Sequence, residues 1–241
     1  MQMYLISRVK QVVFPNLLKS EDLHCILRHK NIDVGHQTIF YSPGRTIIDT
    51  SRPALLKIGD YCKITSGVII LTHDYSRSVL RRAYGDIIGE GRETIIGDNV
   101  FIGMNSIILM GSKIGSNVII GAGSVVSGEI PDNVVVAGNP AKMIRSLDEH
   151  YIIMKNRMLK EAESYYHLFK MKYGKEPTIK EMDPFYPVFL ERDPESLTKN
   201  SINMKLGGDN EIEVLSSFLS SEPTFKNYQD FIEHCRSLYN D

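Results

Sequence analysis

The sequence places a histidine and an aspartate next to each other at the entrance of a charged segment. His73 and Asp74 come directly before residues 76–93, a polar stretch with several arginines, carboxylates and glycines. An imidazole exchanges a proton near neutral pH, so His73 is a candidate general base whose ring Asp74 would orient. A histidine can also cap a corner of the chain, and Asp74 can point into a turn. The residue types alone leave both interpretations open.

The residues on both sides of this pair repeat with a period of six. A helix face recurs every 3.6 residues and an ordinary strand every two, so this period belongs to neither. It is typical of a parallel β-helix, in which each hexad forms a short strand and a corner and its aliphatic side chain points into the coil. The repeated aliphatic positions are Ile58, Ile64, Ile70, Ile96, Ile102, Ile108, Ile114, Ile120 and Val126.

Two further hexad positions agree with this interpretation. Glycine follows the aliphatic residue in several hexads, where the backbone is expected to turn a corner, and small side chains occupy the fifth position. The register does not carry from Ile70 to Ile96, so residues 76–93 are predicted to leave the coil as a loop. Loops on a rigid scaffold often carry binding groups, although a tolerated surface insertion has the same pattern. The small side chains at the fifth position of the hexads are Cys62, Val68, Val100, Ser106, Ser112, Val118 and Ser124.

The pattern divides the chain into three segments. Residues 1–31 form an N-terminal helical segment with a helix over 20–29, residues 32–145 form the β-helix, and residues 146–241 form a helical C-terminal extension. The fold class is therefore mainly β. The extension begins with a capping box at Ser146 and Glu149, its first helix ends at Gly174, and two more helices are predicted at about 209–220 and 224–239. One apolar stripe on the first helix comprises Leu147, Tyr151, Met154, Met158, Ala162, Tyr165 and Phe169.

Composition limits the partners and the compartment. The chain has 241 residues and a formal net charge of -1, which gives no general argument for a nucleic acid or an acidic membrane as partner. Cys25, Cys62 and Cys235 are odd in number and widely spaced, as expected for reduced thiols. No apolar run reaches the roughly 18 residues of a membrane span, and no signal-peptide core is present. We expect a cytoplasmic protein.

Four ordered motifs carry a resemblance to a known family. They are Ile70–Ser76, Ile96–Ser106, Ile119–Val126 and Val136–Lys142. Together they resemble the hexapeptide-repeat acyltransferases, in particular the branch of maltose, galactoside and xenobiotic acetyltransferases and, within it, capsular polysaccharide O-acetyltransferases. The resemblance covers residues 32–145. It implies a left-handed β-helix, a homotrimer, and acetyl-CoA bound in a cleft between adjacent coils.

The resemblance assigns the chemistry to His73, which matches the family's catalytic histidine after a threonine. A sugar hydroxyl is a poor nucleophile at neutral pH. The imidazole would take its proton as the hydroxyl attacks the thioester carbonyl, and backbone N–H groups would stabilise the oxyanion.

The resemblance also implies a set of cofactor-binding residues. The pantetheine arm is expected along the corners of the coil, the phosphates at nearby cations, and an aromatic wall at Phe101, where the galactoside branch often has tryptophan. Many relatives carry Thr-Lys where this chain has Ser127-Gly128, so one phosphate-side lysine is missing. The expected cofactor residues are Phe101, Met104, Lys113, Ala122, Gly123, Ser127, Lys142 and Arg145.

The acceptor is expected at the loop and the first coil, through Arg77, Arg81, Asp86, Glu90 and His36. The predicted function is O-acetylation of a carbohydrate, a unit or precursor of a surface polysaccharide. One alternative is N-acetylation of a nucleotide-linked amino sugar. Such enzymes usually add an N-terminal nucleotide-binding domain, for which about 30 residues leave no room. A non-catalytic β-helix platform is the second alternative. No metal is predicted, because a zinc site needs about three convergent ligands and the coil holds two histidines.

Overall fold

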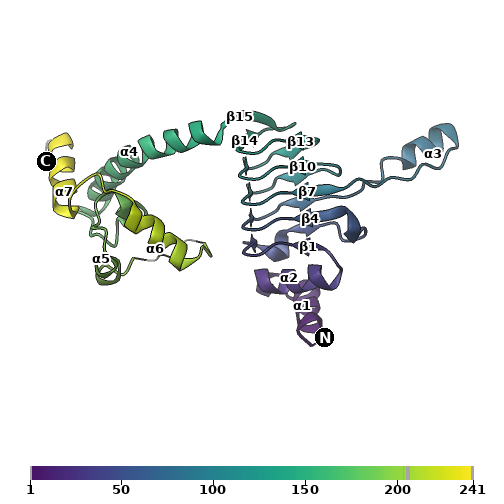
Figure 1. Ribbon diagram of the computed structural model, residues 1–241, viewed down its shortest axis with the longest axis horizontal. Helices are drawn as coiled ribbons and strands as arrows, with labels where there is room; N and C mark the ends of the chain where they lie inside the picture. The colour runs from purple at the N-terminus through teal and green to yellow at the C-terminus, as the bar shows by residue number, and fades with distance from the viewer. Residues whose placement is uncertain (1, 203, 205–206, 240–241) are drawn as a thin grey trace. The chain divides into compact units, whose positions relative to one another are not determined.

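A computed structural model describes residues 2–202, 204 and 207–239. The chain forms two compact units, residues 1–150 and 151–241. The first unit confirms the predicted left-handed parallel β-helix, and its N-terminal helices belong to the same unit as the coil (Figure 1).

The coil consists of three sheets, and each turn adds one short strand to every sheet. All pairs are parallel except the last, β14 with β15. The first sheet contains β1 (Asp33–Val34), β4 (Leu56–Ile58), β7 (Thr94–Ile96), β10 (Lys113–Ile114) and β13 (Glu129–Ile130). The second contains β2 (Ile39–Phe40), β5 (Lys63–Ile64), β8 (Phe101–Ile102), β11 (Ile119–Ile120), β14 (Val134–Ala137) and β15 (Lys142–Ser146). The third contains β3 (Ile47–Ile48), β6 (Ile69–Ile70), β9 (Ile107–Ile108) and β12 (Val125–Val126).

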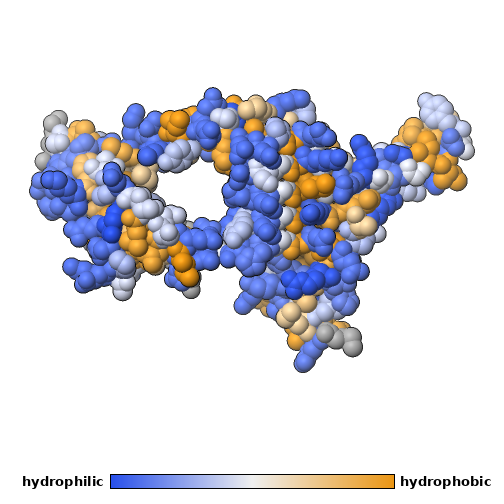
Figure 2. Space-filling model, viewed as in Figure 1, coloured by the Kyte–Doolittle hydropathy of each residue, from blue (hydrophilic) through white to orange (hydrophobic). Residues whose placement is uncertain are grey.

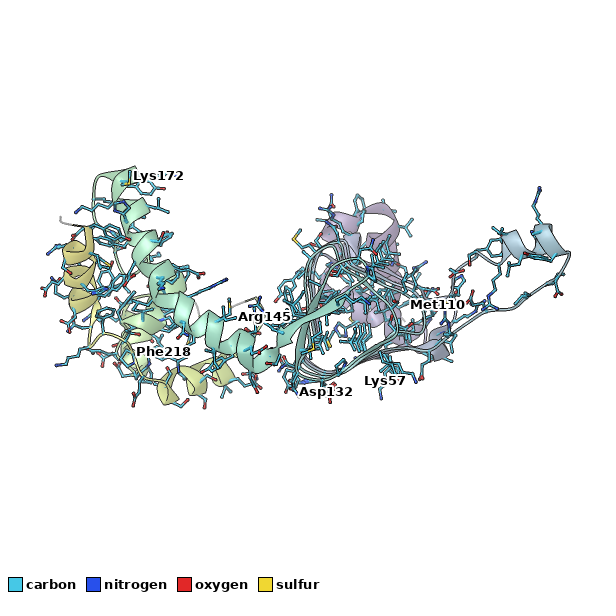
Figure 3. All side chains as sticks on the ribbon, turned by 90° about the horizontal axis from the view of Figure 1, so that it is seen from above. Lys57, Met110, Asp132, Arg145, Lys172 and Phe218 are labelled. Atoms are coloured by element: carbon cyan, nitrogen blue, oxygen red, sulfur yellow. The ribbon has the colours of Figure 1, made fainter. Side chains whose placement is uncertain are left out.

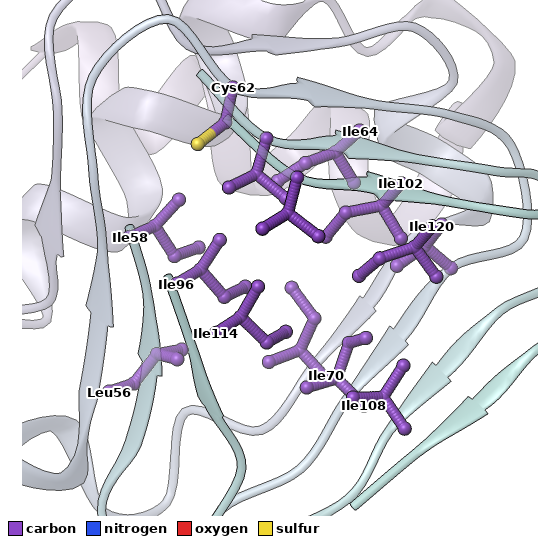
Figure 4. Packing of buried hydrophobic residues seen from close by; sticks show 14 of the residues in the cluster. Leu56, Ile58, Cys62, Ile64, Ile70, Ile96, Ile102, Ile108, Ile114 and Ile120 are labelled. Atoms are coloured by element: carbon purple, nitrogen blue, oxygen red, sulfur yellow. The ribbon is translucent and has the colours of Figure 1, made fainter. Parts of the chain in front are cut away.

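The predicted aliphatic positions form the core of the coil. Ile102 pairs in register with Ile120 on the next turn, and Ile96 pairs with Ile114. The repeat therefore stacks like on like, and Figure 4 shows the isoleucines in columns along the inside of the sheets. All nine predicted aliphatic positions and all seven predicted small positions are buried. Burial of β-branched side chains against identical neighbours stabilises each turn in the same way.

The corners differ in detail from the sequence expectation. The glycines after the aliphatic residues allow successive turns to approach closely, because a Cβ on Gly103 would lie only 2.5 Å from the backbone nitrogen of Ala122. The corner itself is made two residues later, where Asn105 has a φ of 58°. Asparagine is among the non-glycine residues that tolerate this left-handed region best. The equivalent positions with positive φ are Tyr61, Gly67, Asn99, Gly111, Asn117 and Gly123.

The predicted loop leaves the coil between β6 and β7. It carries the short helix α3 (Ser78–Tyr84), which ends at Gly85 with a φ of 74° and projects away from the sheets (Figure 1). Seen down the stack of turns, the loop departs beside the corner that carries Met110 (Figure 3). Apolar side chains gather on this projection (Figure 2). The larger exposed ones are Tyr75, Val79, Leu80, Tyr84, Ile87 and Ile88.

Helices pack on the N-terminal end of the coil, and a long helix begins where the last strand of the coil ends. At the N-terminal end, α1 (Gln2–Val13) packs on α2 (Ser20–His29), whose bounds match the predicted helix, and Leu23 and Leu27 join the coil core. At the other end, Ser146 and Glu149 form the predicted capping box, with bonds of 3.0 and 3.1 Å, at the start of α4 (Leu147–Tyr173). Short 3-10 helices are η1 (Pro15–Leu17), η2 (Pro43–Arg45), η3 (Pro53–Leu55) and η4 (Asp183–Val188).

The second unit is helical and has an aromatic core of its own. Tyr166, Phe189 and Phe231 are fully buried in it. Of the predicted stripe on α4, Ala162 and Phe169 are buried, whereas Tyr151, Met154 and Tyr165 are exposed. Tyr166, outside the stripe, is buried against Phe231. Gly174 ends α4 as predicted, with a φ of 65°. The remaining helices are α5 (Pro194–Lys199), α6 (Glu211–Ser220) and α7 (Tyr228–Tyr239).

None of the helices that the structure describes has both the length and the apolar character needed to cross a bilayer.

Candidate functional site

Parallel pairing of two short strands brings an aspartate against His73. Asp49 follows β3, and His73 follows β6, which pairs with β3 through Ile47 and Ile69 and through Ile48 and Ile70. Because parallel strands end at the same edge of a sheet, the residues after both strands meet there. Nδ1 of His73 lies 2.5 Å from Oδ2 of Asp49. The two residues form a histidine–carboxylate pair, 24 positions apart in the chain.

The surroundings of Asp49 keep its carboxylate charged. Burial alone would raise the pKa of this carboxyl, but hydrogen bonds from Thr72, Ser51 and His73 outweigh it and hold the pKa well below its ordinary value. The backbone N–H and the hydroxyl of Ser51 donate to Oδ1 over 3.0 and 2.7 Å, and Thr72 donates to Oδ2 through its N–H and its hydroxyl.

An ionised carboxylate accepts hydrogen bonds but donates none, so Nδ1 of His73 must carry the proton that it shares with Asp49. This assignment leaves Nε2 of the neutral ring with its lone pair. The His73 side chain is 36% exposed, whereas that of Asp49 is 8% exposed. His73 can therefore meet a ligand while its partner stays behind it, and the arrangement suits proton abstraction by Nε2.

The prediction that Asp74 orients His73 is wrong in this structure. The Asp74 carboxylate accepts bonds from the N–H and the hydroxyl of Ser76, at 2.9 and 2.6 Å, and is exposed. The chain leaves the coil at this point, so Asp74 makes a local turn with its own neighbour and does not occupy an inward hexad position. Sequence reasoning missed Asp49. No period in the sequence points to Asp49, because only the pairing of Ile48 with Ile70 in the folded chain places Asp49 next to the residues that follow β6.

The base of the loop forms a small pocket around His73, with a volume of about 160 Å³. Of the predicted acceptor residues, Arg77, Arg81 and Glu90 line it together with His73, whereas Asp86 does not. Nε of Arg77 lies 2.7 Å from Oε2 of Glu90, an ion pair that joins the two sides of the loop. The pocket is also lined by Arg52, which the sequence analysis did not single out.

His36 lies elsewhere on the same unit. It lines a larger pocket of about 770 Å³ between α1, α2 and the first coil, and its ring is 6.3 Å from the ring of Tyr61. The two pockets share no lining residue, so the structure does not bring His36 to His73 within one chain.

The predicted cofactor residues are spread over the outside of the coil. Met104 and Gly123 meet at one corner, where the N–H of Gly123 donates to the carbonyl of Met104 over 2.8 Å. A Cβ on Gly123 would touch nothing within 4 Å, so the backbone there is open to an extended ligand. Ala122 and Ser127 are exposed nearby in the chain, Phe101 is exposed on β8, Lys113 is on β10, and Lys142 and Arg145 are on β15.

The carboxyl ends of the strands in the third sheet form one edge, and His73 lies at this edge, after β6. Ser127 follows β12, two strands along from the β6 end in the order β12–β9–β6–β3. Lys113 belongs to the first sheet and the β15 residues to the second, so a single chain does not gather all the predicted cofactor residues at one place. In the described ranges, no three histidine, cysteine, aspartate or glutamate side chains converge as a metal site would require.

Comparison with known proteins agrees with this architecture. Residues 93–128 match the family model described as bacterial transferase hexapeptide (six repeats). Protein CapG of Staphylococcus aureus is 44% identical over 138 residues, which cover 57% of this chain and 79% of that protein. Galactoside O-acetyltransferase of Escherichia coli is 51% identical over 59 residues, only 23% of this chain and 29% of that protein.

Among solved structures, a hexapeptide-repeat acetyltransferase from Vibrio cholerae in complex with acetyl coenzyme A is 21% identical. It covers 61% of this chain and 87% of its own, with a TM-score of 0.45. The extent of the CapG match, together with the hexapeptide family model, shows that the chain belongs to the hexapeptide-repeat acyltransferase family.

Proposed function

We propose that this protein is an acetyl-CoA-dependent O-acetyltransferase that acts on a hydroxyl of a carbohydrate, a unit or precursor of a surface polysaccharide. The observation that carries the proposal is the His73–Asp49 pair at 2.5 Å, placed in a pocket at the base of the loop. The name of the galactoside O-acetyltransferase, which shares 59 matched residues with this chain, supports a sugar hydroxyl as acceptor.

The His73–Asp49 pair supports the following proton path for this reaction. Nε2 of His73 accepts the proton of the acceptor hydroxyl as that oxygen bonds to the thioester carbonyl carbon. Asp49 holds the opposite nitrogen and stabilises the positive ring that results. As the carbon–sulfur bond breaks, His73 returns the proton to the departing thiolate, so the ring ends neutral and the acetyl ester and free coenzyme A thiol leave.

We place the donor along the outside of the coil. The open corner at Met104, Ala122 and Gly123 offers backbone groups to the peptide-like pantetheine arm, and Phe101 offers an aromatic wall. Lys113, Lys142 and Arg145 are exposed or half-exposed cations suited to the phosphates. Because these groups are spread over the first and second sheets and a corner of one chain, a cleft between two chains would combine them more readily than one chain alone.

We accordingly propose a homotrimer. The projecting loop supports it, because Tyr84 and Ile87 are 80% and 86% exposed, far more than a loop that served one chain alone would need. Burial of such side chains against a second copy would remove them from water. Sedimentation equilibrium is expected to give three times the 27.3 kDa chain mass, and a catalytically active monomer would contradict the proposal.

The decisive test is an acceptor panel. Release of coenzyme A thiol from acetyl-CoA would be followed with neutral mono- and oligosaccharides, with glucosamine, and with a nucleotide-linked amino sugar. Turnover on hydroxyl acceptors supports the proposal. Turnover restricted to the amines would favour the N-acetyltransferase alternative, and no turnover with any acceptor, despite binding of acetyl-CoA, would favour the platform alternative.

A second test concerns the loop. Residues 76–93 are proposed to choose the acceptor, since their base lines the pocket of His73. Replacing the loop by a short Gly-Ser link is expected to raise the acceptor KM or abolish transfer, while coenzyme A affinity by calorimetry stays within a few-fold. Loss of coenzyme A affinity with unchanged acceptor preference would assign the loop to the donor site.

A further inference from the structure

Arg52 has features that the proposed proton transfer does not use. It lies three residues beyond Asp49 and lines the same pocket as His73. Its Nη1 is enclosed, yet has no hydrogen-bond partner among the residues that the structure describes. Leaving a charged, enclosed donor unpaired is costly, because a guanidinium that loses water needs an acceptor in its place.

The backbone above Arg52 leaves room for this side chain. A Cβ on Gly91 would lie 3.5 Å from Nη1 of Arg52 and 3.4 Å from its Cδ. Gly91 lies where the loop returns to the coil, before β7 begins. The Arg52 side chain therefore lies next to this returning segment and also lines the pocket.

The charges that line the pocket are not balanced. Arg52, Arg77 and Arg81 line the pocket together with the carboxylates of Asp74 and Glu90, so the lining has one more positive than negative charge. Glu90 is paired with Arg77 at 2.7 Å and lies 3.8 Å from Arg92, and the Asp74 carboxylate accepts hydrogen bonds from Ser76. Arg52 and Arg81 form no ion pair with any described residue. Behind the imidazole, both oxygens of Asp49 already accept bonds from Ser51, Thr72 and His73. The pocket therefore offers unpaired positive charge beside the base.

We propose that the acceptor is an acidic sugar whose anionic group is bound by Arg52 while its hydroxyl faces His73. This inference rests on the proposed acetyl transfer and names its substrate class. A planar guanidinium fits a carboxylate or a phosphate with two parallel hydrogen bonds. The volume of about 160 Å³ is below the roughly 300 Å³ at which pockets for drug-sized ligands begin, so one sugar unit fits better than a nucleotide.

The experiment compares three matched acceptors, glucose, glucuronate and glucose 1-phosphate, with the wild type and with Arg52→Gln, Arg52→Lys and Arg82→Gln. Arg82 belongs to the same loop but does not line the pocket, so it is the matched control. For the wild type, an anionic acceptor is expected to have a KM at least about 10-fold below that of glucose.

Arg52→Gln is expected to raise the KM of the anionic acceptor about 10- to 100-fold, the loss typical of a hydrogen bond to a charged group, and to leave the glucose value within about two-fold. Arg52→Lys is expected to raise this KM less than Arg52→Gln does, because lysine keeps the positive charge but cannot form the two parallel hydrogen bonds of a guanidinium. A lower KM for glucuronate than for glucose 1-phosphate identifies a carboxylate, and the reverse order identifies a phosphate.

Equal KM values for all three acceptors in the wild type, or an equal rise for glucose and the anions in Arg52→Gln, would overturn the inference and leave Arg52 a structural role. Saturation-transfer NMR with glucuronate and glucose 1-phosphate separates this outcome from failure of the proposed function. Binding of an anion that Arg52→Gln abolishes supports the site even in the absence of turnover, and no anion binding in the wild type refutes it.

Discussion

The coil and the second unit are stabilised by different kinds of core. In the coil, one side-chain type recurs at equivalent positions, and Ile102 stacks on Ile120 through a repeated hydrogen-bond ladder. In the second unit, Tyr166, Phe189 and Phe231 pack at individual angles, for example 85° between the rings of Tyr166 and Phe231. Repetition makes each turn of the coil predictable. The candidate chemistry of the coil lies where that repetition is interrupted.

The described residues of each unit include a histidine–carboxylate pair, and the two pairs differ in what surrounds them. Nε2 of His234 lies 2.7 Å from Glu163 in the second unit and connects α7 to α4. His73 is bound to Asp49 through Nδ1, which leaves Nε2 for a ligand in the pocket. Similar ion pairs can therefore serve packing in one region and proton transfer in the other. The following experiments test that distinction.

The largest effect is expected for His73→Ala. Loss of the general base should lower turnover about 10²- to 10⁴-fold while coenzyme A affinity, measured by calorimetry, stays nearly unchanged. His234→Ala is the control, because it removes the histidine of the second pair and should leave turnover within a few-fold. Near-normal turnover in His73→Ala would remove His73 from the mechanism.

Phe231→Ala tests whether the two cores are energetically separate. Truncation of a fully buried aromatic residue should cost about 3–5 kcal/mol, and Ile102→Ala in the coil about 2–5 kcal/mol. Calorimetric unfolding is expected to show the second unit's transition lowered by Phe231→Ala alone and the coil's by Ile102→Ala alone. A single transition shifted by both variants would show that the two units unfold together.

Asp49→Asn should have a smaller effect than loss of the base. An amide cannot stabilise the positive ring, so turnover is expected to fall about 10- to 10²-fold, part of the 10²- to 10⁴-fold that a general base contributes. Asp74→Asn is the matched comparison and should lower turnover less, because Asp74 bonds Ser76. A larger loss in Asp74→Asn would reverse the assignment of the orienting residue.

Asp49 also predicts a pH dependence of stability. Its pKa in the folded protein lies below its ordinary value of about 3.9, so its contribution to the free energy of unfolding is present above that pH. This contribution is lost as the pH falls towards the folded pKa. Denaturant melts measure the difference in the free energy of unfolding between wild type and Asp49→Asn. This difference should shrink progressively as the pH falls below about 3.9, and a difference that grew in acid would contradict the depressed pKa.

The last prediction concerns no variant and only the chemical reactivity of the cysteine thiols, where the smallest effect is expected. Burial raises the pKa of the Cys235 thiol to about 12 and also raises the pKa of Cys62, whereas Cys25 is half-buried on α2. Iodoacetamide at pH 8 should label Cys25 in the native protein and the other two only after unfolding. Mass spectrometry of tryptic peptides measures this, and early labelling of Cys235 would show that the second unit opens readily.

The hexad pattern by itself determined the architecture of the coil. The aliphatic hexad positions from Ile96 to Val126 are buried as predicted because each one meets its own copy one turn away, so local spacing already contains the long-range contact. The helix at Ser20–His29 and the capping box at Ser146 were equally readable, since their signals lie within a few residues of the chain. His73 was identified through its flanking motif, and its catalytic role stays a prediction.

Only the tertiary structure decided which groups face His73. Ile48 pairs with Ile70 across 22 positions, whereas Ile108 pairs with Val126 across 18, and irregular corners before β4 account for the difference. Simple counting therefore does not bring Asp49 level with His73, and the adjacent Asp74 was the natural but incorrect choice. Arg52 lines the pocket, and the loop passes next to it at Gly91 where it returns to the coil. Contacts that depend on an interrupted repeat require the folded chain, since no local period encodes them.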